Sequence, residues 1–218
     1  MVRILIVESH PIVRAALARI LQADPNFEIC GEVDTVISGL EAVERLKPDL
    51  VVTEVLFKSG SGFNFIRSVR RRRRAPRILV FTSYGEDWFK DQVLRAGAAA
   101  FLAKDAGSEE ILETVRDIVR NPSGAGRQPT PGAAFLTSEE ITERGALASL
   151  SSRELEVFSL IGYGLATSEI AARLNVSPKT VESHRERLKK KLQIKNGAAL
   201  SSAATAWMLQ LSSTASGV

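Results

Sequence analysis

Short apolar runs alternate with amphipathic segments through residues 1–120. Each run holds four to seven β-prone residues between polar breaks, as expected for buried parallel strands. The runs are Arg3–Val7, Phe27–Val33, Leu50–Val55, Ile78–Phe81 and Ala99–Leu102. Helical periodicity follows them over Ile12–Ala23, Val36–Leu46, Phe63–Arg73, Trp88–Arg95 and Glu109–Arg120. Five strand-then-helix units predict an α/β domain with a doubly wound, five-stranded parallel sheet.

Four polar residues stand at the ends of these predicted strands. Ligand sites of doubly wound sheets form at the carboxyl ends of the strands. Glu8, Glu54, Thr82 and Lys104 occupy those positions. We therefore expect their side chains to meet at one edge of the sheet.

The pattern changes after residue 120. Residues 121–149 are rich in Pro, Gly and Ser and are predicted to be a linker, with a short helix starting near Thr137–Ile141. Residues 150–218 form a small all-α domain in this reading. Its first helix has a capping box, Ser151 with Glu154, flanked by Leu150 and Leu155 at the hydrophobic-staple positions.

The following helices match a helix-turn-helix. Gly162 and Gly164 end the first helix, and Thr167 is expected to cap a short helix over Ser168–Leu174. After a turn, a longer helix begins with Ser177 as N-cap and Pro178 and runs to about Leu192; a fourth covers about Ala198–Leu211. A short helix, a tight turn and a longer helix are the arrangement that places a recognition helix in the major groove of DNA.

The longer helix has two different sides. Val181, Leu188 and Leu192, with His184 beside them, would pack on the other helices, and we expect His184 to pack and hydrogen-bond rather than to sense pH. The opposite side is polar and fits a major groove. It carries Lys179, Glu182, Ser183, Glu186, Arg187 and Lys190. The free N–H groups at the helix start can bind a phosphate.

Charge favours the same region for DNA binding. The chain has 218 residues and a net charge of +4. Residues 1–120 carry 18 basic and 17 acidic side chains, whereas residues 150–218 carry nine and five. A basic small domain beside a nearly neutral one indicates a polyanionic partner.

Several classes of protein are disfavoured. No apolar run approaches the roughly 18–20 residues that span a bilayer, and the start of the chain becomes acidic too early for a secretory signal. We therefore expect a cytoplasmic protein without a membrane partner. Cys30 is the only cysteine, and His10 and His184 are far apart, so neither a disulfide nor a metal site is expected. No hydrolase triad or P-loop is present, which argues against an enzyme.

The C-terminal residues resemble the LuxR-type helix-turn-helix of NarL/FixJ response regulators. The match runs through Leu150–Val157, Thr167–Leu174, Val176–His184 and Leu188–Leu192. The resemblance implies that Lys179, Thr180, Ser183 and Arg187 face bases or nearby phosphates and that Thr167, Ser168 and Lys190 hold the backbone, with Ser177 at the helix start. It also implies a homodimer, joined through the fourth helix.

Two acidic residues do not fit a DNA-facing surface. Glu182 and Glu186 could each accept a hydrogen bond from a cytosine amino group. Alternatively, Glu186 pairs with Lys190 four residues later, which we favour. Phosphate contact by at least one of Lys189, Lys190 and Lys191 is expected.

The N-terminal residues resemble a CheY-like receiver. Ile4–Arg14, Pro48–Glu54, Val80–Ser83 and Gly97–Lys104 carry the match. The resemblance implies a two-component phosphorelay, in which an acidic pair and an acceptor aspartate bind Mg²⁺, the aspartate takes a phosphoryl group, and a lysine and a hydroxyl bind its oxygens. A sensor kinase or another regulatory protein would then be a partner.

This sequence departs from the receiver pattern at its centre. The acidic pair reads Glu8-Ser9, the acceptor position is Glu54, and the switch aromatic is Phe101; Thr82 and Lys104 remain. Losing one carboxylate and lengthening another weakens an octahedral Mg²⁺ site, so Mg²⁺ is doubtful and no other cofactor is expected. We expect Glu54 to reach toward Lys104 and Thr82, either standing in for a phosphoryl group or forming only a buried ion pair.

The sequence thus predicts a DNA-binding transcription regulator that is not switched by ordinary aspartyl phosphorylation. The alternative is a protein-interaction adaptor, or a ligand-gated pseudo-receiver, with only secondary DNA binding. One feature belongs to neither reading: Arg70–Arg74 is an unbroken run of arginines. It could contact DNA or an acidic partner, but we favour a solvated helix end, where cations suit the dipole.

Overall fold

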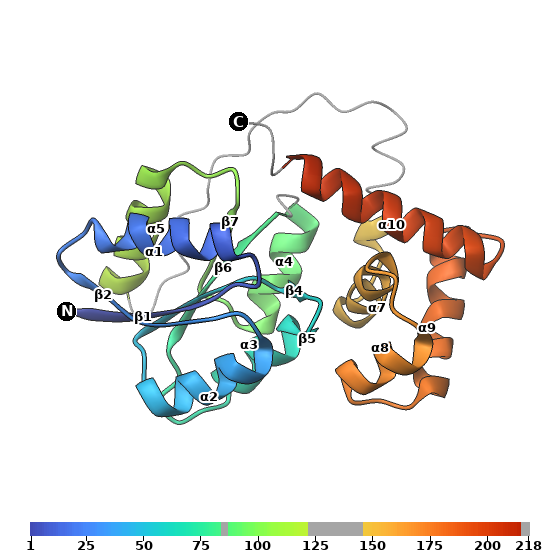
Figure 1. The fold of residues 1–218 in the computed structure, drawn as a ribbon, viewed down its shortest axis with the longest axis horizontal. Coiled ribbons are helices and arrows are strands. Elements are labelled where there is room, and N and C mark those ends of the chain that lie inside the picture. Colours follow the sequence, from blue (N-terminus) through green and yellow to red (C-terminus); the bar gives the residue numbers. More distant parts are fainter. Residues whose placement is uncertain (84–86, 122–145, 215–218) are drawn as a thin grey trace. The chain divides into compact units, whose positions relative to one another are not determined.

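The chain forms two compact units, Met1–Pro129 and Thr130–Val218, in a computed structural model. The structure describes residues 1–83, 87–121 and 146–214. Each unit folds around its own buried residues, and Figure 1 labels the elements of both.

The first unit is built on a five-stranded parallel sheet of order β2-β1-β3-β6-β7. Its strands are β1 (Val2–Val7), β2 (Phe27–Val33), β3 (Leu50–Thr53), β6 (Arg77–Thr82) and β7 (Ala100–Ala103). Every strand lies within two residues of its predicted position, because a strand covered on both faces is a nearly continuous apolar run. The predicted fold class is confirmed.

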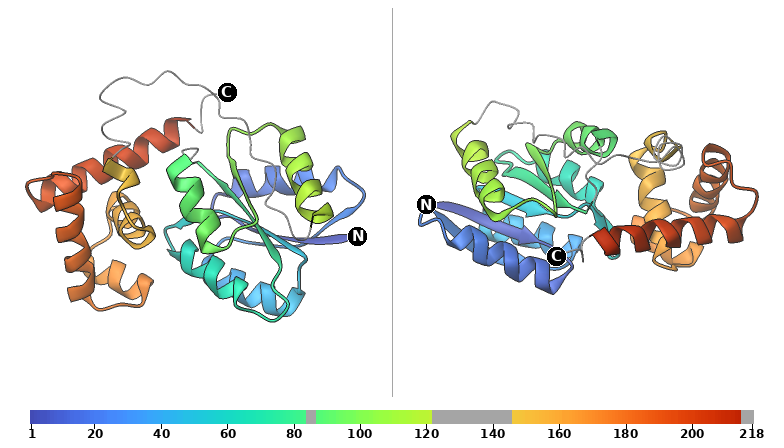
Figure 2. Two further views of the ribbon diagram at one scale, coloured as in Figure 1. Left: turned by 180° about the vertical axis from the view of Figure 1, so that it is seen from behind. Right: turned by 90° about the horizontal axis from the view of Figure 1, so that it is seen from above.

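Helices cover both faces of this sheet (Figure 2). They are α1 (Pro11–Gln22), α2 (Val36–Leu46), α3 (Gly62–Arg70), α4 (Asp87–Ala96) and α5 (Ser108–Arg120). A core cluster joins α1 and α5 to one face of the sheet, and Ile4 and Ile6 of β1 belong to it. The alternate residues Leu5 and Val7 are also fully buried, which shows that the opposite face is covered as well.

The segment after β3 differs from the prediction. A strand was expected to continue to Val55, but β3 ends at Thr53 and a hairpin that was not foreseen follows, β4 (Leu56–Phe57) with β5 (Gly60–Ser61). Gly62 lies so close to the backbone of Val55 that a Cβ would collide with the Val55 carbonyl oxygen. The turn of the hairpin into α3 therefore requires a residue without a side chain.

The second unit is helical, as predicted. It contains α7 (Ser152–Gly162), α8 (Thr167–Leu174), α9 (Pro178–Lys191) and α10 (Gly197–Thr214), with a further helical turn before them. Leu155 of α7, Ile170 of α8, Val181 of α9 and Leu200 of α10 are fully buried together, so the four helices share one core. The ring of Phe158 packs against that of Trp207 at 5.1 Å between centroids.

The helix starts follow the predicted capping signals in two cases of three. The capping box of Ser151 with Glu154 is present, and the Ser177 side chain accepts a hydrogen bond from the Thr180 amide. The cap of α8 was wrong: Ala166 is the N-cap and Thr167 is the first helical residue. The Glu169 carboxylate accepts from the Ala166 amide at 2.8 Å, which satisfies the helix start without a capping hydroxyl.

Two further findings complete the description. The helix expected near residues 137–141 lies outside the described residues. Within the described ranges, no helix combines the length and the apolar character needed to cross a membrane.

Candidate functional site

The carboxyl edge of the sheet brings together the polar residues that stand at the strand ends. Glu8 follows β1, Glu54 follows β3, Thr82 ends β6 and Lys104 follows β7. Because β1, β3, β6 and β7 are parallel neighbours, these positions lie at one edge. Glu8, Glu54 and Thr82 are at most 4% exposed.

A lysine links the two carboxylates of this edge. The Lys104 Nζ lies 2.8 Å from Glu8 Oε2 and 2.9 Å from Glu54 Oε2. The contact with Glu54 follows the expectation from the sequence, whereas the contact with Glu8 was not foreseen. Two acidic side chains therefore share one lysine.

The remaining oxygen of Glu54 is also engaged. Glu54 Oε1 accepts hydrogen bonds from the backbone amides of Val55 at 2.6 Å and Leu56 at 3.4 Å. Both carboxylate oxygens of Glu54 are therefore bound within the protein. A carboxylate held at both oxygens is a poorly available nucleophile.

Glu8 is fixed in the same way. Its Oε1 accepts from the His10 backbone amide and contacts His10 Nδ1, each at 2.8 Å. Burial by itself would raise the pKa of Glu8, but the hydrogen bond from His10 and the charge of Lys104 outweigh burial and lower this pKa. Glu8 is therefore ionised at neutral pH.

Lys104 responds to the same charges in the opposite direction. Burial would lower the pKa of its ammonium, but the negative charges of Glu54 and Glu8 prevail and raise it. Lys104 is therefore a cation at neutral pH. Its partner carboxylates stabilise that charge where water cannot.

Three expected members of the pocket are not part of this cluster. Thr82 Oγ1 is buried and makes no hydrogen bond with any residue that the structure describes, so the expected contact from Glu54 to Thr82 was wrong. Ser9 is half-buried and its hydroxyl lies 3.5 Å from His10 Nδ1. Phe101 is buried and packs edge-on against Phe89, with 6.2 Å between ring centroids.

The residues at this edge do not fit a Mg²⁺ ion. Mg²⁺ prefers several oxygen ligands in octahedral geometry. Here the Lys104 ammonium stands between the two carboxylates, and the second residue of the acidic pair is Ser9. A second cation would be repelled by Lys104, so we derive no step through a metal.

The polar side of α9 is exposed in the second unit. All six of its predicted members are exposed: Lys179, Glu182, Ser183, Glu186, Arg187 and Lys190. The opposite side carries Val181 and Leu188, which are fully buried. Hence α9 presents one continuous polar face.

The two acidic residues of this face have partners within the protein. Thr167 Oγ1 donates to Glu182 Oε1 at 2.7 Å, which ties the start of α8 to α9. Glu186 pairs with Lys189 at 2.8 Å and not with Lys190, so the predicted pair was wrong. Lys189 and Lys190 follow Glu186 by three and four residues, and both spacings allow an ion pair on a helix. Side-chain rotamers decide which pair forms.

The three consecutive lysines of α9 have different surroundings. Lys191 Nζ contacts Glu154 Oε2 at 2.7 Å and donates to the Ser149 carbonyl at 2.8 Å, so it joins the end of α9 to the start of α7. Lys189 is held by Glu186. Lys190 is exposed and forms no ion pair with a described residue.

Hydroxyl groups near the start of α9 bond mainly to one another or to the helix. Ser177 Oγ lies 2.8 Å from Thr180 Oγ1, and Ser183 Oγ donates to the Lys179 carbonyl at 3.0 Å. Ser168, in the first turn of α8, is exposed. The structure therefore leaves Ser168, Lys179, Arg187 and Lys190 as the predicted contact residues without a side-chain partner among the described residues.

A half-buried guanidinium joins α7 to the end of α8. Arg153 Nη2 donates to the Leu174 carbonyl at 2.8 Å, and Arg153 Nη1 pairs with Glu156 at 3.2 Å. This contact fixes the end of α8, just before the turn into α9. Sequence reasoning missed it, because the helical pattern places Arg153 only on α7.

His184 is half-buried in the second unit. Burial lowers the pKa of its imidazole, and the positive charges of Arg187 and Arg153 lower it further. Its Nδ1 is buried without a hydrogen-bond partner among the described residues. The expected packing is observed, but the expected hydrogen bond at Nδ1 is not.

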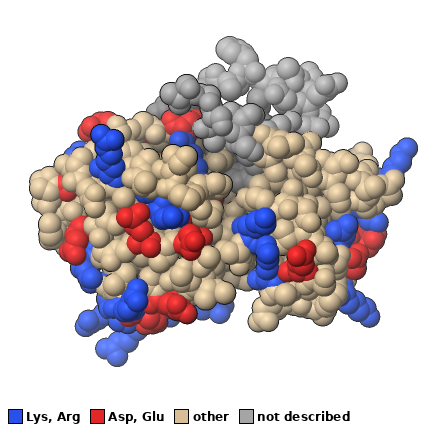
Figure 3. Space-filling model, viewed as in Figure 1, with Lys and Arg blue, Asp and Glu red and all other residues tan. Residues whose placement is uncertain are grey.

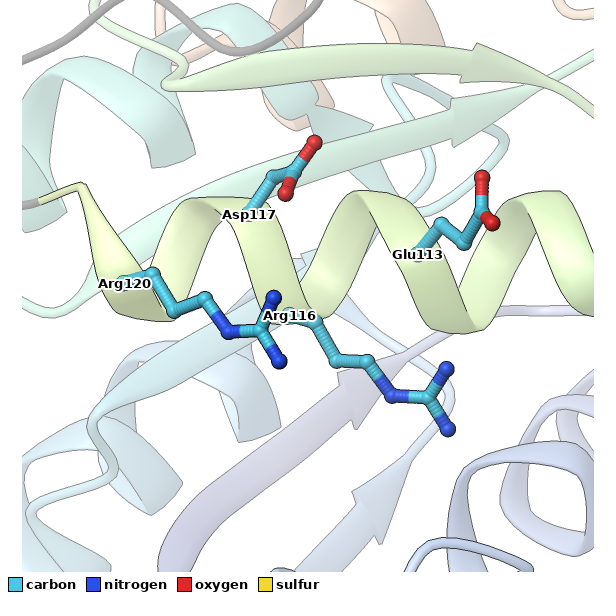
Figure 4. A pocket seen from close by; sticks show the side chains of 4 residues that line it. All are labelled: Glu113, Arg116, Asp117 and Arg120. Atoms are coloured by element: carbon cyan, nitrogen blue, oxygen red, sulfur yellow. The ribbon is translucent and has the colours of Figure 1, made fainter.

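A separate surface pocket lies on α5 (Figure 4). Glu113, Arg116, Asp117 and Arg120 line it. Arg116 Nε pairs with Asp24 at 2.8 Å, and Asp24 precedes β2. The pocket is therefore at the amino edge of the sheet, away from Lys104.

Two family models match the chain. Residues 4–116 match the response regulator receiver domain, and residues 148–204 match the bacterial regulatory proteins of the luxR family. Among curated proteins, the chain is 30% identical over 197 residues to the DNA-binding transcriptional activator DevR/DosR of Mycobacterium tuberculosis, with 88% of each chain covered. It is 28% identical over 194 residues to the response regulator GacA of Pseudomonas aeruginosa, with 89% of this chain and 91% of GacA covered.

Solved structures show the same architecture. The receiver domain of the putative response regulator NarL from Mycobacterium tuberculosis matches with a TM-score of 0.52 and 28% identity, over 55% of this chain and 96% of that one. RcsB of Salmonella enterica serovar Typhimurium, bound to promoter rprA, matches with a TM-score of 0.70 and 21% identity, and the match covers 94% of this chain and 99% of RcsB. The chain therefore belongs to the response regulators, as a receiver domain followed by a DNA-binding regulatory domain of the luxR family.

Proposed function

We propose that this DNA-binding transcription regulator keeps its receiver in one state, held by the cluster of Glu8, Lys104 and Glu54, and is not switched by aspartyl phosphorylation. The observation that carries the proposal is the 2.9 Å contact between Lys104 Nζ and Glu54 Oε2. It places a permanent carboxylate against the lysine that, in switched receivers, binds the transferred phosphoryl group.

Two properties of Glu54 support this proposal. Its side chain is one methylene longer than aspartate, which displaces a nucleophile by about an ångström, and catalysis by positioning tolerates such displacement badly. Both of its oxygens also accept contacts inside the protein. A phosphoryl donor would have to break the buried ion pair before reaction.

The DNA-binding part of the proposal rests on α9. Lys179, Arg187 and Lys190 are exposed on one side of that helix. At the start of the helix Pro178 has no N–H and the Thr180 amide bonds to Ser177, so the Lys179 amide is the group that we assign to a phosphate. We assign Lys179, Thr180, Ser183 and Arg187 to bases and nearby phosphates, and Ser168 and Lys190 to the DNA backbone. We further propose that the protein binds paired half-sites on DNA as a homodimer. It would act in the cytoplasm.

Phosphoryl transfer is tested by mass spectrometry. The full chain is incubated with acetyl phosphate and Mg²⁺, and the expected result is no acid-labile phosphate on the receiver. The variant Ser9→Asp/Glu54→Asp restores both missing aspartates and serves as the positive control. Stoichiometric phosphate on the unmodified chain would contradict the proposal.

DNA recognition is tested separately, by selection of bound fragments from genomic DNA. The expected result is a recovered site bound about a thousandfold or more tightly than unrelated duplex at moderate salt. If every fragment binds with the same weak affinity, the second candidate, a protein-interaction adaptor, is favoured instead.

A further inference from the structure

An arginine-rich surface of the receiver is not explained by the proposed function. Arg70–Arg74 are five consecutive arginines. Helix α3 ends at Arg70, Arg71 is its C-cap, and Arg72–Arg74 lie beyond the helix. We refer to Arg71, Arg73 and Arg74, which are exposed, as the arginine surface.

Neighbouring carboxylates do not neutralise this surface. Arg72 pairs with Glu44, but Glu44 also pairs with Lys47 at 2.8 Å. The hydrogen bond from Lys47 lowers the pKa of Glu44, and the charge of Arg72 lowers it further. One carboxylate therefore serves two cations, and a positive charge is left over.

The arginine surface itself has no acidic partner. None of Arg71, Arg73 and Arg74 forms an ion pair with another residue in the described part of the chain. Figure 3 shows Lys and Arg side chains, with Asp and Glu beside them, along the lower margin of the receiver, where Figure 1 has α2 and α3. The excess positive charge is thus local to the end of α3.

The helix dipole does not account for so many cations. A helix C-terminus carries about half a negative charge, and its effect fades within the last turn. Arg67 and Arg70 already occupy the last turn of α3. Arg73 and Arg74 lie beyond the cap, so a solvated helix end explains the first arginines and not the last two.

We propose that the arginine surface binds phosphates of the duplex DNA that the luxR-type domain holds. This inference rests on the DNA-binding part of the proposed function. The planar guanidinium donates paired hydrogen bonds that match phosphate oxygens. Because both domains are on one chain, DNA bound to one is at high effective concentration for the other. A free acidic protein has no such tether, and for this reason we favour DNA.

The proposal is tested by the salt dependence of DNA binding. Fluorescence anisotropy of a labelled duplex of unselected sequence is measured with the full chain from about 50 to 300 mM salt. Each phosphate contact contributes about 0.9 to the slope of log K against log salt. Arg73→Gln/Arg74→Gln should therefore lower the slope by about one to two. If the affinities of the variant and of the unmodified chain become equal at 1 M salt, each lost contact weakens binding by about eightfold at 0.1 M salt.

Two matched variants separate phosphate contact from other effects. Arg73→Lys/Arg74→Lys keeps the charge and should keep the slope. Arg19→Gln/Arg120→Gln removes the same charge from exposed positions of α1 and α5, which share the opposite face of the sheet, and should leave the slope unchanged. Thermal unfolding of each variant checks that the fold is intact.

The outcomes are distinguishable. An unchanged salt slope in Arg73→Gln/Arg74→Gln would overturn this inference but leave the DNA-binding function in place. The same unchanged slope is expected if the arginine surface binds an acidic protein instead of DNA. An equal loss in Arg19→Gln/Arg120→Gln would also overturn it, because net charge would then be the cause. If the unmodified chain binds no duplex, both proposals are wrong.

Discussion

The ammonium of Lys104 lies 2.9 Å from the carboxylate of Glu54, at the carboxyl edge of the sheet. Both side chains are at least nine-tenths buried. A buried ion pair is costly to form but far more costly to break from one side, because the remaining charge stays in a medium that solvates it poorly. Removal of one partner of this pair should therefore lower the stability of the receiver.

Replacing Lys104 should destabilise the receiver strongly. Lys104→Met leaves two buried carboxylates without their cation, and we expect the free energy of unfolding to fall by about 3–5 kcal/mol at pH 7. Urea unfolding followed by circular dichroism measures the change. Lys104→Met/Glu54→Gln removes one of the stranded charges and should recover part of the loss. An unchanged midpoint for Lys104→Met would show that the ion pair contributes nothing.

The stability of the receiver should depend on pH through Glu8. The folded state lowers the pKa of Glu8 below its value in the unfolded chain, which is about 4.3. Its contribution is therefore fully present above that pH and is lost as the pH falls through the folded pKa. Unfolding measured between about pH 7 and pH 3 should show a shallower acid loss for Glu8→Gln than for the unmodified chain. If both proteins lose the same stability as the pH falls, carboxylates other than Glu8 cause the loss.

The sequence predicted the positions of the site residues well and their contacts less well. Glu8, Glu54 and Lys104 follow from a rule about parallel strands, so the sheet edge was predictable before any coordinates. Which oxygen meets which donor depends on side-chain rotamers. For that reason the Lys104–Glu8 contact was missed and a contact from Glu54 to Thr82 was wrongly expected.

In the fold, features set by neighbouring residues were predictable, whereas features set by distant contacts were not. The Ser151–Glu154 box was predictable because both residues lie within one helical turn. Strands of two residues, as in β4 and β5, are too short to show any alternation, so the hairpin could not be predicted. Thr167 satisfies the sequence preference for an N-cap, but its hydroxyl bonds to Glu182, fifteen residues later, and such a tertiary contact leaves no local pattern.

Lys190 and Lys191 should behave differently although they are neighbours. Lys190 is exposed without an ionic partner in the described chain, so Lys190→Ala should lower the salt slope of DNA binding by about 0.9 for every DNA sequence. Lys191 is bound to Glu154 and Ser149. Lys191→Ala should instead lower stability by about 1–3 kcal/mol and leave the slope unchanged. An unchanged slope for Lys190→Ala would remove that residue from the phosphate contacts.

Glu182 should act as an internal acceptor rather than as a reader of bases. Its carboxylate holds the hydroxyl of Thr167 and lies 3.9 Å from Arg185. Glu182→Gln removes a negative charge from the polar face of α9, so affinity for all duplexes should rise by about twofold to fivefold, or about 0.4–1 kcal/mol. The ratio of specific to nonspecific affinity, measured on a selected site and an unrelated duplex, should stay the same. A loss confined to sites with one particular cytosine would instead assign Glu182 to that base.

His184 should make the second unit less stable in mild acid. Burial and the charges of Arg187 and Arg153 lower its pKa in the folded state, so the unfolded chain binds the proton more tightly. The contribution of neutral His184 is therefore complete above the unfolded pKa of about 6.5 and is lost as the pH falls below it. Unfolding of the unmodified chain and of His184→Leu is compared between about pH 7.5 and pH 5.5. The unmodified chain should lose stability over this range and His184→Leu should lose less, whereas equal losses would show that His184 does not cause the change.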